Sequence, residues 1–266
     1  MQPPPQHPVM PLHFRPAVPL RQQPDLPCYQ PTLSAENPVQ VWAFCLNAPD
    51  EAVAYWHTLL STEEQQRAGR FIHREQQRRW VAAHGLKREV LSAYLQKPPE
   101  QLKFVVLPDG KPVLQLLDHE IIYFNLSHSR DRLLLAVSGI SKVGVDLEHH
   151  DTTRPFWALA QRFFHPDEVE PMKAMTEAAA RRQFYRAWVA KEALLKAQGS
   201  GLKGGLARWP VPCNGSDQVE LGGWNVHWLP LTEPGVYGAL AVESEKSWSW
   251  ISRGHDLHNT LDYRNE

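Results

Sequence analysis

Near the middle of the chain stands Val143-Gly144-Val145-Asp146-Leu147-Glu148, in which apolar residues alternate with small or acidic ones. This alternation predicts a β-strand, because successive side chains of a strand point to opposite faces. Asp146 and Glu148 then share one face, and Leu147 points the other way into the core. Two neighbouring carboxylates repel each other, and a hard divalent cation is the common remedy. The stretch therefore predicts a metal-binding strand, which we expect at the junction of two lobes.

A long helix predicted over residues 176–198 supplies a further acid. Trp188, Glu192 and Lys196 are spaced four residues apart, so they lie close together on one helix face. Glu192 also lies between Lys191 and Lys196, a pattern equally typical of a surface ion pair. Trp188 favours a position near the core. With the acids of the strand, these residues predict a site for Mg²⁺ and a phosphate.

A cluster of hydrogen-bond donors follows another predicted strand, over residues 121–125. It reads Asn125-Leu126-Ser127-His128-Ser129, and small hydroxyls with exposed amides at a strand end suit a phosphate oxygen. The alternative is a polar turn whose serines satisfy local backbone groups. Lys111, in a Gly-Lys-Pro turn, is a phosphate ligand or a solvated turn lysine.

Composition limits the class of protein. The chain has 266 residues and a net charge of −1 at pH 7, which gives no case for bulk attraction to nucleic acid or membrane. Its three scattered cysteines indicate a reducing compartment. No apolar run approaches the roughly 18 residues that span a bilayer, and the N-terminus lacks the features of a signal peptide. We therefore expect a soluble cytoplasmic protein.

Four regions are expected along the chain. Residues 1–38 form a Pro/Gln-rich leader that is extended over the domain or disordered. Residues 39–142 form an N-terminal lobe, 143–246 a C-terminal lobe and 247–266 a surface tail. In the first lobe a helix is predicted to begin at Thr62 as N-cap, with Gln65 closing a capping box, and to reach about Leu95 with a break near His73. The other predicted strands are 39–44, 104–107, 133–137, 219–221, 224–229 and 236–242, and the other helices are 156–164 and one from 166.

Three of these segments, in order, resemble the signature motifs of the 4′-phosphopantetheinyl transferases. They are residues 125–129, 144–148 and 188–196. Residues 70–79 and 110–112 are similar to the larger, surfactin-synthetase-activating type of that family. The resemblance covers roughly residues 39–245, and it rests on the joint occurrence of motifs that are weak one by one.

The resemblance implies an α+β fold of two pseudo-symmetric lobes, each a small antiparallel sheet packed with helices, with the active site in the cleft between them. It implies transfer of the 4′-phosphopantetheine arm of coenzyme A to a serine of an apo acyl or peptidyl carrier protein, with release of 3′,5′-ADP. Mg²⁺ is the expected metal, with Mn²⁺ as an alternative. A monomer that binds no nucleic acid and no membrane is expected.

Site residues follow from the same resemblance, position by position. The metal-binding acids are matched by Asp146, Glu148 and Glu192, and the lysine on the CoA phosphate by Lys196. Contacts to the nucleotide and its phosphates are matched by Arg67, Arg79, Lys111, Ser127 and His128. Glu192 is the candidate base, acting directly or through a metal-bound water, and Lys196 the group that stabilises the leaving phosphate.

Two positions depart from a related enzyme. Glu64 stands in place of a CoA-contacting lysine, and Trp80 in place of a threonine, both at the adenosine end. One alternative function is a catalytically silent module that binds CoA or a carrier protein, which the complete set of acids disfavours. Another is nucleic-acid binding through the basic helix of residues 67–88, which the near-neutral net charge disfavours.

Overall fold

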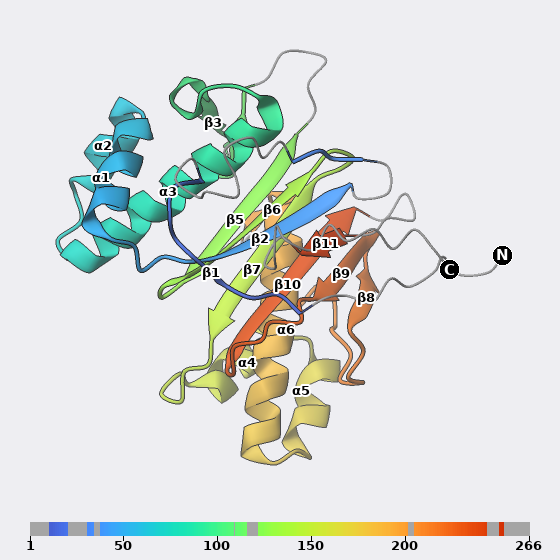
Figure 1. The fold of residues 1–266 in the computed structure, drawn as a ribbon. Coiled ribbons are helices and arrows are strands. Elements are labelled where there is room, and N and C mark those ends of the chain that lie inside the picture. The colour runs from blue at the N-terminus through green and yellow to red at the C-terminus, as the bar shows by residue number, and fades with distance from the viewer. Residues whose placement is uncertain are drawn as a thin grey trace, which may run out of the picture.

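The computed structural model describes residues 11–20, 31–34, 38–108, 110–115, 122–201, 205–243 and, for the backbone alone, 250–252. Two β-sheets occupy the middle of the molecule, and a group of helices lies against each (Figure 1). The expected α+β class is confirmed. Among the helices of these residues, none has both the length and the apolar character that crossing a membrane would require.

The first sheet has the strand order β1-β2-β6-β5. Its centre is antiparallel: β2 (Val39–Cys45) pairs with β6 (Arg132–Ser138), and β6 pairs with β5 (Tyr123–Ser129). Two short strands, β1 (Arg15–Pro16) and β11 (Trp250–Ser252), run parallel to β2.

Helices α1 (Asp50–Leu59), α2 (Thr62–Ala68) and α3 (Arg74–Leu95) belong to the first sheet's side of the molecule. A short 3₁₀ turn, Pro99–Gln101, and a two-stranded hairpin of β3 (Phe104–Val106) and β4 (Pro112–Leu114) follow α3.

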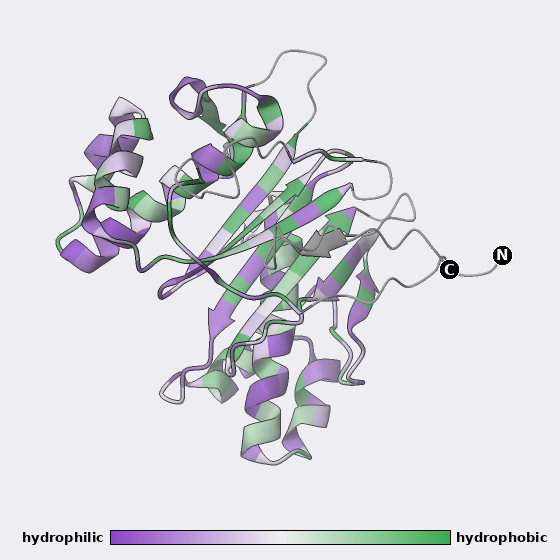
Figure 2. Cartoon of the chain, viewed as in Figure 1, coloured by the Kyte–Doolittle hydropathy of each residue, from purple (hydrophilic) through white to green (hydrophobic). Residues whose placement is uncertain are grey.

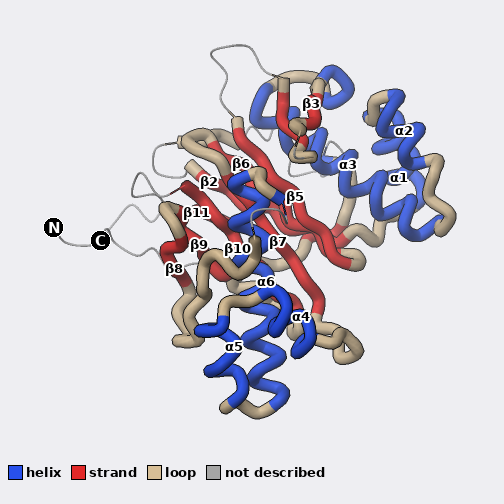
Figure 3. The backbone as a smooth tube through the Cα atoms, turned by 180° about the vertical axis from the view of Figure 1, so that it is seen from behind, coloured by secondary structure: helices blue, strands red, loops and turns tan. Residues whose placement is uncertain are grey.

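The second sheet is antiparallel throughout and has the order β7-β10-β9-β8. Its strands are β7 (Val143–His149), β8 (Gln218–Leu221), β9 (Trp224–Trp228) and β10 (Val236–Glu243). Its helices are α4 (Phe156–Phe163), α5 (Pro166–Lys173) and α6 (Glu177–Gln198). Seen from behind, α6 runs across the strands of this sheet (Figure 3).

Strand alternation divides the apolar residues among three cores. In β2, Trp42 and Phe44 pack toward the first group of helices, whereas Val39, Val41 and Ala43 pack toward the second sheet. Val145 and Leu147 of β7 join that inner core from the other side, as expected for Leu147. The hydrophobic bands of the central strands in Figure 2 reflect this burial on both faces. The two sheets therefore share one apolar layer, the inner core.

Local sequence pattern predicted some helix ends correctly and missed another by one residue. α6 begins after the N-cap Thr176 and ends at Gly199, whose φ of 74° is left-handed, close to the predicted bounds. The break near His73 is confirmed. The predicted N-cap at Thr62 is wrong by one residue: Ser61 is the N-cap, and Glu64 rather than Gln65 completes the capping box.

Two elements differ from the sequence prediction. The strand predicted to end at Asn125 continues to Ser129, so residues 127–129 lie in β5 rather than in a turn. α1 was not predicted. In the expected C-terminal tail, residues 250–252 pair with β2, and most of the tail's other residues lie outside the described parts. Of the leader, residues 11–20 are extended across the domain, and Leu12 is fully buried.

Candidate active site

The site begins with a close crossing of α6 over β7 at Gly144. A Cβ atom at this position would lie 2.1 Å from the carbonyl oxygen of Ala193 and 2.4 Å from the nitrogen of Ala197. No other residue type fits against a helix backbone at this separation. Gly144 thus lets α6 rest directly on the strand that carries Asp146 and Glu148.

Asp146 is the centre of the polar contacts at this crossing. One of its oxygens, Oδ1, accepts hydrogen bonds from Lys196 Nζ at 2.6 Å and from Ser127 Oγ at 3.0 Å. Lys196 Nζ also donates to Ser127 Oγ at 2.9 Å. The other carboxylate oxygen, Oδ2, is buried and has no hydrogen-bond partner. β5, β7 and α6 therefore meet through three predicted site residues.

The other two acids lie within the electrostatic reach of Asp146. Burial raises the pKa of Glu192, and the charges of Asp146 and Glu148 raise it further, while Lys196 opposes them. Burial likewise raises the pKa of Glu148, with Arg154 opposing and Asp146 adding to the effect. Negative charge on this face is thus under-compensated, which is the condition that a bound cation relieves.

These acids do not form a closed metal cage. Among the residues with assigned structure, no three His, Cys, Asp or Glu side chains are gathered tightly enough to hold a metal ion. Lys196 and Arg154 contact Asp146 and Glu148 instead. The unpartnered Oδ2 of Asp146 and the raised pKa values of Glu148 and Glu192 nevertheless fit an oxygen-liganded divalent cation.

Strand β5 closes the site from the first lobe. Its side chains Asn125 and Ser129 accept hydrogen bonds from the backbone N–H groups of Val145 (2.9 Å) and His149 (3.4 Å) in β7. β5 and β7 are edge strands of the two sheets, so side chains of β5 accept the hydrogen bonds of backbone N–H groups that β7 leaves open at its sheet edge. This role of Asn125 and Ser129 was missed, because nothing in the sequence pairs β5 with β7.

His128 points to the opposite side of β5 from Ser127, since the two are adjacent in the strand. Its side chain is exposed, yet crowding around the ring lowers its pKa, and the charge of Lys196 lowers it further. His128 therefore lies within the field of Lys196, and no contact of the described residues joins it to the acids.

Lys111 reaches the same region from the β3–β4 turn. Its ammonium donates to the carbonyl oxygens of Lys196 (2.7 Å), Ala197 (3.1 Å) and Val143 (3.3 Å). It is neither the solvated turn lysine that was one reading of the sequence nor, in these contacts, a group directed at the acids.

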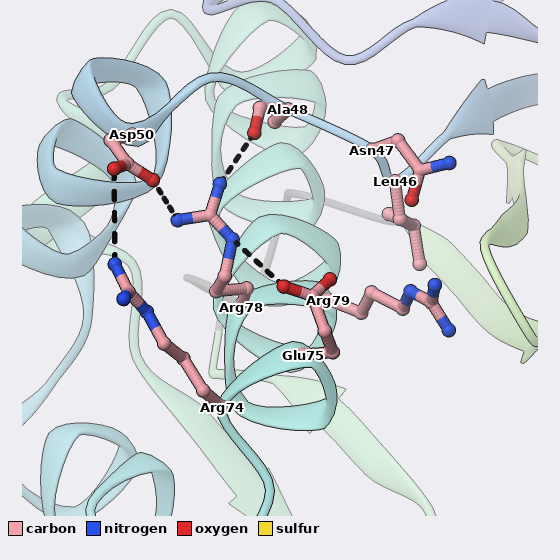
Figure 4. Close-up of a pocket in the computed structure, with 8 residues that line it drawn as sticks. All are labelled: Leu46, Asn47, Ala48, Asp50, Arg74, Glu75, Arg78 and Arg79. Carbon is pink, nitrogen blue, oxygen red and sulfur yellow. Dashed lines mark hydrogen bonds and ion pairs between the residues drawn. The ribbon is translucent and has the colours of Figure 1, made fainter.

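Arg67 lies in α2 and Arg79 in α3, and among the described residues no hydrogen bond or ion pair joins either arginine to the acids. Arg67 stacks over Trp80 at 5.8 Å, and Trp80 is itself stacked on His84 at 3.8 Å. Arg79 lines a pocket of about 480 Å³ at the end of β2, and its Nε is buried without a partner (Figure 4).

The rest of that pocket is an ion-pair network. Arg78 contacts Asp50 and the carbonyl of Ala48, and Arg74 lies 3.8 Å from Asp50. In Figure 4, Arg79 extends away from these pairs, on the opposite side of the pocket. Arg79 is thus the arginine of this group best placed to meet an anion.

Glu64, the departure at the adenosine end, is engaged in ion pairs within the first lobe. Its carboxylate lies 3.0 Å from Lys87 Nζ and 2.6 Å from Arg88 Nη2, and it contacts His84 as well. Because both basic side chains are buried, Glu64 neutralises charge inside the first lobe.

Two further residues near the acids were not identified correctly from sequence. Lys191 does not form a surface pair with Glu192: it is buried with Glu168 at 2.8 Å and donates to the carbonyls of Leu206 and Trp209. Arg154 lies 3.4 Å from Glu148, with its guanidinium over Tyr185. Its place in a loop gave no periodic signal.

Comparison with known proteins gives family matches over most of the chain. Residues 142–231 match the family described as the 4′-phosphopantetheinyl transferase superfamily, and residues 48–142 match the family described as 4′-phosphopantetheinyl transferase, N-terminal. The boundary between the two matches falls just before β7.

Individual relatives carry the name of the same activity. The chain is 37% identical over 165 residues to the 4′-phosphopantetheinyl transferase HetI of a Nostoc species, covering 62% of this chain and 70% of the relative. It is 28% identical over 165 residues to the 4′-phosphopantetheinyl transferase Sfp of Bacillus subtilis, covering 62% and 71%. It is 31% identical over 179 residues to the L-aminoadipate-semialdehyde dehydrogenase-phosphopantetheinyl transferase of Xenopus laevis, covering 63% and 59%.

Proposed function

Since this chain belongs to the 4′-phosphopantetheinyl transferase superfamily, we propose that it transfers the phosphopantetheine arm of coenzyme A to a serine of an apo acyl or peptidyl carrier protein. The other product is 3′,5′-ADP. The carrier is a protein substrate, and the enzyme is proposed to act as a cytoplasmic monomer that requires neither nucleic acid nor membrane.

One observation supports this proposal most directly. The charge of Asp146 reaches Glu148 and Glu192, and Lys196 donates to Asp146 and Ser127 at the crossing of α6 over β7. Acidic oxygens beside an ammonium group can hold a cation and a diphosphate together, which neither charge type does alone.

Asp146, Glu148 and Glu192 are the residues that would hold Mg²⁺, or Mn²⁺ in its place. When bound, such an ion acts as a Lewis acid toward the diphosphate oxygens. The unpartnered Oδ2 of Asp146 gives it a ready oxygen ligand.

The chain's own residues account for binding and proton transfer. Lys196 holds a positive charge where negative charge grows on the leaving phosphate, so it favours the transition state over the ground state. Ser127 keeps the Lys196 ammonium in place through the 2.9 Å hydrogen bond. His128, Arg67 and Arg79 are the proposed contacts for the nucleotide and its phosphates.

Glu192 is the proposed base. The oxygen of the carrier serine forms a new bond to the phosphorus that bears pantetheine, the bond from that phosphorus to 3′,5′-ADP breaks, and the serine proton passes to Glu192 directly or through one water. Burial and the neighbouring acids raise the pKa of Glu192. A base whose pKa lies closer to neutrality accepts a proton more effectively at neutral pH.

A mass measurement tests the function. The purified protein is incubated with CoA, MgCl₂ and a panel of apo carrier proteins from fatty-acid, polyketide and nonribosomal-peptide systems. We expect one carrier to gain the mass of one phosphopantetheine arm, and its serine-to-alanine variant to gain none. Binding of a carrier or of CoA without any mass gain across the panel would support a silent binding module instead.

A further inference from the structure

The end of α6 is held from the other lobe by one side chain. α6 ends in a left-handed Gly199, whose N–H returns to the carbonyl of Leu195 at 2.9 Å. The next two carbonyls, of Lys196 and Ala197, are among those that a helix end leaves without intrahelical donors. Lys111 donates to both of them. A residue from the β3–β4 turn therefore caps a helix of the second lobe.

The same ammonium also contacts β7. It donates to the carbonyl of Val143, the first residue of that strand, at 3.3 Å. The neighbouring residue is Gly144, where α6 and β7 touch with no space for a Cβ atom. Lys111 therefore lies over the point at which the two acid-bearing elements cross.

The turn that presents Lys111 has a defined shape. The N–H of Leu107 donates to the carbonyl of Lys111 at 2.9 Å, and the N–H of Gly110 donates to the carbonyl of Leu107 at 2.8 Å. Gly110 has a φ of 90°, which favours glycine. The β3–β4 pairing fixes the direction of this turn, so Lys111 extends from a supported position.

We propose that Lys111 is a positioning residue for the transfer reaction: its ammonium fastens the end of α6 to the start of β7 and so keeps Glu192 and Lys196 aligned with Asp146 and Glu148. This inference rests on the proposed function. It differs from a direct contact between Lys111 and a CoA phosphate. An ammonium has three donors, and three carbonyl oxygens lie within reach of this one. A phosphate oxygen would have to displace one of them.

Two readouts separate the positioning role from a phosphate contact. In Lys111→Met, the three hydrogen bonds by which the Lys111 ammonium links α6 to β7 (the clasp) are lost. The kcat should therefore fall about 10- to 100-fold, the scale of misaligned catalytic groups, while the KM for CoA stays nearly constant. Backbone amide hydrogen exchange in peptides covering residues 193–200 should become faster, because the helix end loses its cap. Lys103→Met, at an exposed position on the same hairpin, is the matched control and should change neither.

Lys111→Arg completes the set. Arginine keeps the charge but arranges its donors in a planar fork, so it should restore part of the slow exchange and part of kcat. If Lys111→Met does not fold, the exchange rate in Lys111→Arg decides in the same way. Wild-type exchange in every folded Lys111 variant, or a raised KM for CoA with kcat retained, would overturn the inference. Hydrogen exchange needs no turnover, so the clasp is tested even if no carrier is modified by the wild-type protein.

Discussion

Glu192 carries a charge that the folded protein disfavours. Its pKa is raised by burial and by the charges of Asp146 and Glu148. Glu192→Gln should therefore lower transfer by about 10²-fold or more, the scale of a lost general base, while unfolding at the same or a higher temperature than wild type. Transfer kinetics with MgCl₂ check the first part, and thermal unfolding in the presence of a chelator checks the second. Near wild-type turnover would remove Glu192 from the mechanism.

The stability of the Glu192 variant should also depend on pH in a defined direction. A carboxyl group whose pKa is raised by folding contributes stability below its ordinary value of 4.5, and this contribution is lost as pH rises through the folded-state pKa. The advantage of Glu192→Gln should thus be small at acidic pH and larger at about pH 8. Glu220→Gln, at an exposed position in β8 of the same lobe, is the control.

Glu64 is the opposite case, a carboxylate that the fold stabilises. Although burial opposes ionisation, hydrogen bonding with His84 and the charges of Lys87 and Arg88 hold its pKa far below its usual range. Glu64→Gln leaves two buried cations uncompensated, so it should destabilise the protein by about 3–5 kcal/mol near neutral pH. Denaturant unfolding measures this loss.

The pH dependence of this loss has the opposite sign to that of Glu192. The stability from Glu64 is present above the ordinary value of 4.5 and disappears as pH falls through the lowered folded-state pKa. The difference between wild type and Glu64→Gln should therefore shrink on acidification. Glu51→Gln, at an exposed position in α1, is the control and should unfold as wild type does. A difference in the free energy of unfolding between wild type and Glu64→Gln that stays constant as pH falls would show that Glu64 acts by packing rather than by charge.

At the scale of elements, the crossing of α6 over β7 is the contact on which the site depends. Gly144→Ala places a methyl group where two backbone atoms of α6 already lie, at 2.1 and 2.4 Å. The helix must move, so we expect about 1–3 kcal/mol of destabilisation and a loss of transfer larger than the loss of folded protein explains. Gly69→Ala is the matched control, because Gly69 has a φ of −65° and its nearest neighbours lie 3.6 Å or more away. Wild-type transfer by Gly144→Ala would mean that the crossing tolerates movement.

Sequence pattern predicted this element pair but not the contacts that hold it. The alternation in β7 and the four-residue spacing in α6 are local properties, and both elements lie close to their predicted bounds. Lys111 contacts carbonyl oxygens of α6, Lys191 contacts the buried acid Glu168, and Asn125 contacts the edge strand β7. Each of these partners comes from a distant part of the chain. No local period records such tertiary partners, so these residues were interpreted as solvated or as ligands.

At the scale of the whole molecule, both ends of the described chain cross onto the first sheet. β1 and β11 pair with β2, and Leu20 N donates to the carboxylate of Glu89 in α3. Leu12 reaches the second lobe, where it exchanges backbone hydrogen bonds with Pro230 and Thr232. Residues 11–20 thus form a strap that joins the two lobes outside the region matched by the two families.

Leu12 is where the strap enters the inner core, and it is fully buried there. Leu12→Ala should destabilise the protein by about 2–5 kcal/mol through lost apolar burial and the cavity left behind. Ile72→Ala, whose side chain is 94% exposed, is the matched control and should change stability by no more than about 0.5 kcal/mol. Denaturant unfolding, followed by tryptophan fluorescence and circular dichroism, measures both variants. Because β2 and β6 share the inner core with β7 and β10, the Leu12→Ala transition should shift to lower denaturant yet remain single and coincident by the two probes. Two separated transitions would show that the lobes unfold independently and that the inner core does not couple them.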